Sequence, residues 1–241
     1  MKYLTGFHAV TSRLRQKPDT VREIYVDAER KDARAKDLRE LAKRLNVRVL
    51  AVDMKRLDGM AGGVRHQGVV AGADELDMPK FIEDVLEGLA EPPLLLVLDG
   101  VQDPHNLGAC LRVADGAGAH AVIAPKDRSV GLTTAAIKVA SGAAESVPYI
   151  VVTNLARTMR DLKERGIWLI GADDSAGETL YNARLEGALA MVLGAEGEGL
   201  RRLTRDSCDL LVSIPMLGAV ESLNVSVASG IYLYEARRRR L

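Results

Sequence analysis

Cysteine, histidine and aromatic residues are scarce in this chain. Its 241 residues include two cysteines, four histidines and one tryptophan. Cys110 and Cys208 are too few for a disulfide framework, and neither the cysteines nor the histidines show the paired spacing of a zinc site. We therefore expect no protein-bound metal.

Long hydrophobic runs are also missing. No apolar stretch approaches the roughly 20 residues that cross a bilayer, and no apolar run of the signal-peptide type follows the first residues. We expect a cytoplasmic protein that has no membrane partner.

Three glycine motifs of common enzyme classes are absent. The sequence has no Gly-x-Gly-x-x-Gly dinucleotide fingerprint, no Gly-x-x-x-x-Gly-Lys-Ser/Thr phosphate loop and no Gly-x-Ser-x-Gly nucleophile elbow. These absences argue against a nucleotide-dependent oxidoreductase, a P-loop enzyme and a serine hydrolase.

The net charge is zero, with 33 basic and 33 acidic residues, but the charge is unevenly distributed. Residues 1–72 contain 16 Lys and Arg against 9 Asp and Glu, a net charge of +7, so the remaining residues carry −7. A basic first part indicates contact with a polyanion. An inert, solvated basic face is the alternative.

The first part is predicted to be a small α/β domain over 1–72. Apolar residues at helical spacing predict a helix over 31–46, and short apolar runs predict strands over 21–26, 47–52 and 67–71. Gly59–His66 is predicted to be a glycine-rich loop, either a plain turn or a contact to RNA phosphate. The acidic residues 73–79 are predicted to be a linker.

The second part, 80–241, alternates strand and helix. Strands are predicted over 94–98, 121–124, 147–152, 167–171, 188–193 and 210–214, and helices near 81–89, 107–117, 133–144, 155–165, 200–206 and 225–238. This alternation predicts an α/β fold whose mostly parallel sheet is covered on both faces. The arginines of Arg237–Arg240 suit the negative end of the last helix, with RNA contact as the alternative.

Three polar loops follow predicted strands of this second domain: Asp99–Arg112, Leu193–Leu200 and Ile214–Ser226. We expect them to converge at one end of the sheet and to form a transferase site. Because Glu196 and Glu198 would repel phosphate, the second loop suits a neutral or cationic ligand such as the sulfonium S-adenosylmethionine. A tight packing turn is the alternative for this loop.

Four polar side chains in these loops are candidates for chemistry. Asn106 lies near a helix start, where it can cap. Arg112 follows six residues later, either as a functional group or in a rim ion pair. Ser222 and Asn224 belong to a cluster of small polar residues larger than a helix cap requires, which suits binding of a ribose or an amino-acid moiety.

Together these loops resemble the SpoU branch of the SPOUT RNA 2′-O-ribose methyltransferases. The resemblance rests, in order, on Asn106-x-Gly-x-x-x-Arg112, on Leu193-Gly-Ala-Glu-Gly-Glu-Gly-Leu200, and on Ile214-Pro-Met followed by Glu221-Ser-Leu-Asn-Val-Ser226. It spans most of 94–238, and the basic first domain resembles the L30e-like substrate-binding domain that one subgroup carries.

The resemblance implies S-adenosylmethionine-dependent 2′-O-methylation of a guanosine ribose in the P-site loop of 23S rRNA, carried out by a homodimer. It implies a deep trefoil knot in a C-terminal SPOUT domain, which no periodicity predicts. The cofactor contacts that it implies are Gly194, Ile214 and Leu223. The catalytic residues that it implies are Asn106, Arg112, Glu196, Ser222 and Asn224.

Methyl transfer to a ribose hydroxyl needs alignment, a proton acceptor and stabilisation of the developing alkoxide. Arg112 can stabilise the alkoxide or bind the adjacent phosphate, but a guanidinium holds its proton too tightly to suit the role of base. Glu196 can orient Arg112 or accept the proton, and Ser222 and Asn224 can orient the ribose or the cofactor. The same chemistry on tRNA and a non-catalytic RNA-binding assembly factor remain as alternatives.

Overall fold

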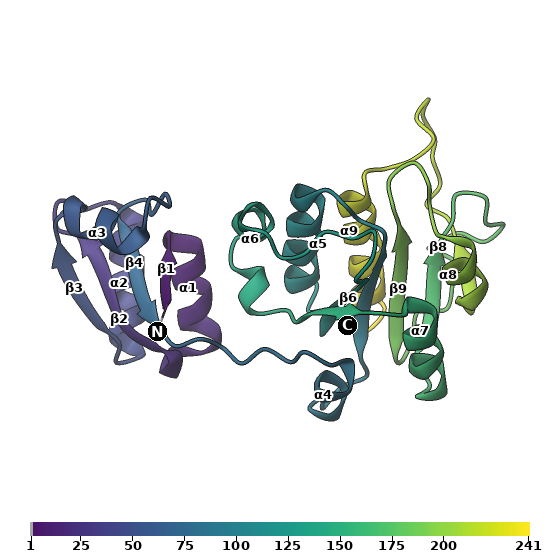
Figure 1. Ribbon diagram of the computed structural model, residues 1–241, viewed down its shortest axis with the longest axis horizontal. Coiled ribbons are helices and arrows are strands. Elements are labelled where there is room, and N and C mark those ends of the chain that lie inside the picture. The colour runs from purple at the N-terminus through teal and green to yellow at the C-terminus, as the bar shows by residue number, and fades with distance from the viewer. Residues whose placement is uncertain (1) are drawn as a thin grey trace. The chain divides into compact units, whose positions relative to one another are not determined.

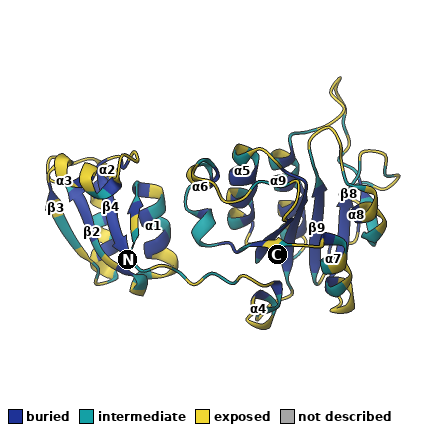
Figure 2. Ribbon diagram, viewed as in Figure 1, coloured by how far each residue is buried: buried dark blue, intermediate teal, exposed yellow. Residues whose placement is uncertain are grey.

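The computed structural model describes residues 2–241, which form two compact units (Figure 1). The first unit extends to Met78, and the second covers Pro79–Leu241. Each unit has buried cores of its own (Figure 2). The division falls within the segment 73–79, whose first residue still belongs to a strand.

The first unit is a mixed four-stranded sheet in the order β1-β4-β2-β3. Its elements are β1 (Lys2–Thr5), α1 (Phe7–Gln16), the short 3₁₀ helix η1 (Pro18–Thr20), β2 (Val21–Asp27), α2 (Ala33–Arg44), β3 (Arg48–Val52), α3 (Met54–Ala61) and β4 (Val69–Ala73). Helices α1 and α2 share one buried cluster, and α3 packs on a separate one. The sequence did not predict β1, α1 or α3. Residues 59–61, predicted as loop, complete α3, which ends at left-handed Gly62 (φ 57°).

The second unit is a six-stranded sheet in the order β10-β8-β9-β5-β6-β7, and every neighbouring pair is parallel. Its strands are β5 (Leu94–Asp99), β6 (Ala121–Pro125), β7 (Tyr149–Val152), β8 (Trp168–Ala172), β9 (Leu189–Gly194) and β10 (Leu210–Val212). Its helices are α4 (Ile82–Glu87), α5 (Pro104–Gly116), α6 (Thr134–Ala140), the 3₁₀ helix η2 (Ala143–Glu145), α7 (Leu155–Glu164), α8 (Arg202–Ser207) and α9 (Val225–Arg238). The predicted α/β fold with a mostly parallel sheet is confirmed.

Helices cover both faces of this sheet (Figure 1). Helices α5, α6 and α9 pack over one buried cluster, and α4 and α7 pack over the other. The central strand β5 sends Leu94, Leu96 and Leu98 into the first cluster and Leu95 and Val97 into the second. Burial on both faces explains why this strand is a continuous apolar run in the sequence.

The start of α5 differs from the prediction. The Asp103 side chain accepts a hydrogen bond from His105 N at 2.9 Å, and Pro104 is the first residue of the helix. Proline suits this position because the first helical N–H has no partner in the helix. Asn106 therefore lies inside the first turn, and the prediction that it caps the helix was wrong. Its side-chain amide is left available for contacts outside α5.

The arginines that end α9 bind the chain itself. Arg237 donates to the carbonyls of Ala117 and Gly118, at 2.9 and 2.7 Å. Arg240 donates to the carbonyls of residues 92, 93 and 187 at 2.6–2.9 Å. These guanidinium groups fasten the C-terminal helix to three connecting segments, which accounts for them without RNA.

Two features are absent from the part of the chain that the structure describes. No helix over residues 2–241 is both long and apolar enough to cross a membrane. Across the same residues, no group of three or more His, Cys, Asp or Glu side chains is placed to hold a metal ion.

Candidate active site

Three loops meet at the carboxyl ends of β5, β9 and β10. Asn106 comes from the first turn of α5, Glu196 from the loop after β9, and Asn224 from the residue before α9. The Asn224 amide donates to Asn106 Oδ1 at 3.0 Å. Both amides also donate to Glu196 Oε2, Asn106 at 3.4 Å and Asn224 at 3.5 Å. The predicted convergence of the three loops is confirmed.

Asn224 has a second role in the local fold. Its side-chain oxygen accepts hydrogen bonds from Ser226 N at 2.9 Å and Ser226 Oγ at 2.6 Å, so it caps α9. With the oxygen committed to the helix, the amide nitrogen points to Asn106 and Glu196. The start of α9 thus fixes the orientation of the three-residue cluster.

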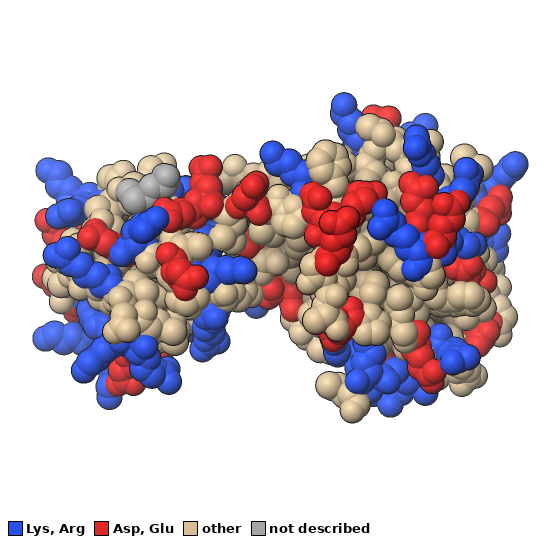
Figure 3. Space-filling view, turned by 90° about the horizontal axis from the view of Figure 1, so that it is seen from below, with Lys and Arg blue, Asp and Glu red and all other residues tan. Residues whose placement is uncertain are grey.

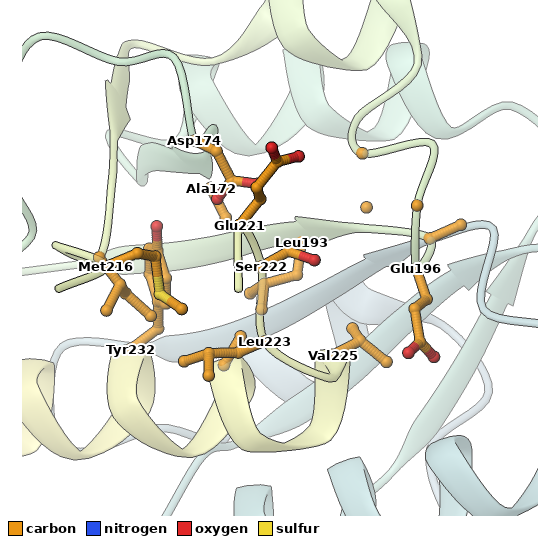
Figure 4. Close-up of a pocket in the computed structure, with 16 residues that line it drawn as sticks. Ala172, Asp174, Leu193, Glu196, Met216, Glu221, Ser222, Leu223, Val225 and Tyr232 are labelled. Atoms are coloured by element: carbon orange, nitrogen blue, oxygen red, sulfur yellow. The ribbon is translucent and has the colours of Figure 1, made fainter. Parts of the chain in front are cut away.

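A pocket of ≈ 300 Å³ opens beside this cluster (Figure 4). Five residues singled out in the sequence line it, namely Gly194, Glu196, Ile214, Ser222 and Leu223. Met216 and Val225 also line it; both lie in the loop Ile214–Ser226 that the sequence had marked, although neither was given a role. Sequence reasoning missed Asp174 and Tyr232, which line the pocket from outside the three loops.

The charge of the pocket is one-sided. Asp174, Glu196 and Glu221 contribute carboxylates to its lining, and none of the lining residues is Lys or Arg. Uncompensated carboxylates favour a cationic ligand and disfavour a phosphate.

The opposite side of the pocket is apolar. Met216 and Tyr232 lie across the pocket from Glu196, and Leu223 and Val225 lie at the start of α9 (Figure 4). The buried Tyr232 hydroxyl donates to the carbonyl of Val212 at 2.7 Å. Burial raises the pKa of Tyr232, so the phenol keeps its proton and this hydrogen bond holds α9 against β10.

The glycines of the loop after β9 allow a tight hairpin. A Cβ on Gly194 would lie 2.0 Å from the backbone of Gly199, so only glycine fits there. Gly199 N donates to the carbonyl of Ala195 at 3.0 Å and closes the hairpin. The hairpin carries Glu196 toward the two asparagines.

A buried ion pair holds the far end of this hairpin. Asp99, the last residue of β5, is 1% exposed. It accepts hydrogen bonds from Arg201 N at 3.0 Å, from Arg201 Nε at 2.6 Å and from Arg201 Nη2. Since Asp99 also pairs in register with Gly194, both ends of the hairpin are fixed at one point of the sheet. The two partners lie 102 positions apart, and no local pattern in the sequence connects them.

Arg112 does not join the pocket of its own chain. It is exposed on α5 and is not among the lining residues. A helix turns by about 100° per residue, so the six positions that separate Arg112 from Asn106 place the two on different faces of α5. Glu196 binds the two asparagines, and the expected contact between Glu196 and Arg112 does not occur within residues 2–241.

Comparisons with known proteins match both units. A family model described as "SpoU rRNA Methylase family" matches residues 93–234, and one described as "RNA 2′-O ribose methyltransferase substrate binding" matches residues 3–79. A protein of Ralstonia nicotianae named 23S rRNA (guanosine-2′-O-)-methyltransferase RlmB is 62% identical over 99% of this chain and 96% of its own length.

Two solved structures show how far the likeness extends. The SpoU methyltransferase AviRb from Streptomyces viridochromogenes is 26% identical, with a TM-score of 0.72 over 99% of this chain and 89% of that one. A TrmH/SpoU tRNA modifying enzyme from A. aeolicus is 27% identical, with a TM-score of 0.56 over 66% of this chain and 80% of that one. The second likeness leaves about a third of this chain unmatched.

Proposed function

The chain belongs to the SpoU rRNA methylase family, and from this membership we propose that it transfers a methyl group from S-adenosylmethionine to the ribose 2′-hydroxyl of a guanosine in 23S rRNA. The target that we propose is the P-site loop. One observation carries the proposal: the cluster of Asn106, Glu196 and Asn224 stands at the edge of an acid-lined pocket.

We infer that this pocket binds the methyl donor. S-adenosylmethionine supplies a methyl group on a sulfonium, whose positive charge the carboxylates of Asp174 and Glu221 would attract. The pocket's volume, ≈ 300 Å³, is at the lower end of the range of ligand sites. The proposed contacts are the backbone groups of Gly194, Ile214 and Leu223, which line the pocket.

The arrangement of Glu196 suits an acceptor for the ribose proton. Both amide donors approach one oxygen, Oε2, which leaves Oε1 for a further donor such as the 2′-hydroxyl. A carboxylate held by two amides is pre-oriented, and a positioned base lowers the barrier to proton loss. Ser222 lines the same pocket with an exposed hydroxyl that would orient the ribose.

Arg112 enters this account through a second copy of the chain. It makes no hydrogen bond or ion pair with any residue in the described range, and its chain's own pocket lies elsewhere. We propose a homodimer in which Arg112 of the partner subunit reaches the pocket and stabilises the developing alkoxide or binds the adjacent phosphate.

The surface around Arg112 supports this dimer. Helices α5 and α9 pack closely, so that a Cβ on Gly116 would lie 2.9 Å from the Tyr234 hydroxyl. On α9, Val227 is 52% and Tyr234 is 53% exposed. Large exposed apolar side chains on α9, which packs on the helix that carries the exposed Arg112, are typical of an interface rather than of free surface.

We propose that the trefoil knot implied by the resemblance forms around β10. After β10 the chain runs beside the loop between β8 and β9, where Leu180 N donates to the Ser213 carbonyl at 2.9 Å. The chain then returns from this edge of the sheet to α9, which packs near the centre, on β9 and α5. A crossing of this kind at the pocket would hold its walls in place.

The first unit is the proposed RNA-binding domain with the L30e-like fold, covering 1–72 and joined by the linker 73–79 to the methyltransferase domain 80–241. Lys and Arg side chains cover much of its visible face (Figure 3).

The tRNA enzyme and assembly-factor alternatives are not favoured, since the relative named for 23S rRNA matches both units. We propose a cytoplasmic protein without a membrane partner, because its proposed substrate is ribosomal RNA.

The test is to map ribose methylation of 23S rRNA and tRNA by mass spectrometry in cells with and without this gene. We expect one guanosine of 23S rRNA to lose its methyl group on deletion and to regain it with the wild-type chain but not with Glu196→Ala. Unchanged rRNA together with a lost tRNA methyl group would replace this proposal with the tRNA alternative.

A further inference from the structure

We propose that the first unit contains a pocket for one unstacked nucleobase of the RNA substrate, and that guanine fits it best. The proposal rests on the proposed function, because it requires RNA as the substrate. It adds a recognition point in a unit that takes no part in the methyl-transfer pocket described above.

The pocket lies where the α3–β4 loop meets the end of β2 and the start of α3. It has a volume of ≈ 470 Å³. Its lining includes Asp27, Arg30, Met54, Asp58, Val64 and Arg65. A volume of this size is within the range of small-molecule sites.

The loop that forms the pocket, residues 62–68, is held in a defined shape. Its three glycines, Gly62, Gly63 and Gly68, have positive φ, and so does Gln67, which is not a glycine (φ 51°). The buried His66 donates from Nε2 to Asp58 at 2.9 Å and accepts from Gly68 N at Nδ1 at 3.2 Å. These two partners, one on each ring nitrogen, fix the orientation of the imidazole ring.

Arg30 fixes the same loop from the other side. It donates to the Gln67 carbonyl and to Asp32, and its guanidinium lies 4.7 Å from the centre of the Phe7 ring. Arg30 therefore stabilises the wall of the pocket. A wall that is pre-formed in this way loses little entropy when a ligand enters.

The open side of the pocket is apolar and cationic. Met54 is 47% and Val64 is 46% exposed, and these two apolar side chains line the cavity. Arg65, also exposed, makes no ion pair among the residues that the structure describes. Single-stranded RNA is recognised by stacking of its bases on aromatic side chains or guanidinium planes and by contacts to its phosphates. Here Arg65 can supply the guanidinium plane, and Met54 and Val64 can supply an apolar surface for the face of the base.

The polar groups of the pocket select for a donor-rich base. Asp27 and Asp58 place carboxylates in the lining, and Gln67 adds an amide. Carboxylates accept hydrogen bonds and repel phosphate, so a site for the RNA backbone alone does not fit them. Guanine presents an imino N–H and an amino group side by side, which matches a carboxylate better than the single amino group of adenine or cytosine does.

The first experiment uses the full-length protein and short single-stranded RNA probes. The sequences are UUGUU, UUAUU and the same pentamer with an abasic central position, and binding is followed by amide chemical shifts. We expect UUGUU to shift the amides of residues 62–68, to bind several-fold more tightly than UUAUU, and to lose this effect when the base is removed. Equal shifts with all three probes would overturn the proposal.

The second experiment measures affinity for a 23S rRNA transcript. The double variant Met54→Ser and Val64→Ser is expected to bind about tenfold more weakly, because it loses the contact with one base. Tyr3→Ser is the matched control, since Tyr3 is 42% exposed in the same unit and does not line the pocket. Amide chemical shifts of β2 and β4 that match those of the wild type show that the first unit of the double variant is folded.

The two proposals fail in different ways. If the wild-type chain does not methylate 23S rRNA, the proposed function is wrong. If it does, and the double variant binds the transcript as tightly as the wild type, the nucleobase pocket alone is wrong.

Discussion

Asn224 is the residue at which helix formation and the proposed chemistry meet. Its oxygen caps α9, and its nitrogen reaches Asn106 and Glu196. A single side chain therefore sets the position of the helix and the orientation of the site.

Replacing Asn224 with aspartate separates these two roles. Asn224→Asp keeps an oxygen for the cap but loses the donor and places a second carboxylate beside Glu196. We expect a melting temperature near that of the wild type and a fall in kcat of about a hundredfold or more, the scale of losing a positioned acid–base group. Methyl transfer to rRNA, with calorimetry alongside, measures both.

Asn154→Ala is the control for capping. Asn154 caps α7 by accepting from Arg157 N at 3.0 Å, and it does not line the pocket. The variant should lose about 1 kcal/mol of stability and keep its activity. A fully active Asn224→Asp protein would remove Asn224 from the mechanism.

Gly194 tests the shape of the hairpin. Gly194→Ala places a Cβ 2.0 Å from the Gly199 backbone, so the hairpin must move, and we expect binding of S-adenosylmethionine to weaken by about tenfold or more. Gly177→Ala is the control, because a Cβ there meets nothing within 4 Å. Isothermal titration measures both variants, and equal affinities would show that the hairpin does not form the cofactor site.

At the scale of elements, the sequence predicts the second unit better than the first. Strands such as β5 are uniform apolar runs because both of their faces are buried, and the helices between them carry periodic apolar residues. In the first unit, α3 was hidden because it ends in the glycines that were assigned to a loop. The site was predictable as three converging loops, whereas the Asp99–Arg201 pair depends on pairing of β5 with β9 and has no local signal.

The Asp99–Arg201 pair is expected to act as a positioning element for the hairpin. We expect Arg201→Ala to weaken cofactor binding by about tenfold and to leave kcat nearly unchanged. The pair holds the hairpin in place and touches no reacting atom. The matched control is Lys163→Ala. Lys163 pairs at 2.8 Å with Asp209, which likewise accepts a backbone N–H, from Leu169 at 2.9 Å, at the amino ends of β8 and β10.

Both variants remove a partly exposed cation from a mostly buried carboxylate, so both should lose stability. Only Arg201→Ala should change the affinity for the cofactor. A parallel loss of affinity in Lys163→Ala would mean that general destabilisation, rather than the hairpin, explains the effect.

At the scale of the whole molecule, the proposed site needs two chains. The sequence marked Arg112 but not its separation from the pocket, because that separation depends on the helix face and on a partner that a single chain does not contain. The structure shows which face of the helix carries Arg112, because it places this residue on the exposed side of α5.

Mixing two inactive variants tests the shared site. Arg112→Ala and Glu196→Ala should each be inactive as homodimers. In a mixed dimer, one of the two sites combines the intact Glu196 of one chain with the intact Arg112 of the other. We therefore expect activity to return on co-expression, in the purified heterodimer. Continued inactivity of the heterodimer would place Arg112 and Glu196 in the same site of one chain.

The most direct test of the central claim is methyl transfer by the purified protein. Unmodified 23S rRNA transcript is incubated with methyl-labelled S-adenosylmethionine, and the product is mapped by mass spectrometry. The account predicts one methyl group for each transcript, on the 2′-oxygen of a single guanosine, and none with Glu196→Ala. Label on a base, label on tRNA in preference to rRNA, or no label at all would contradict it.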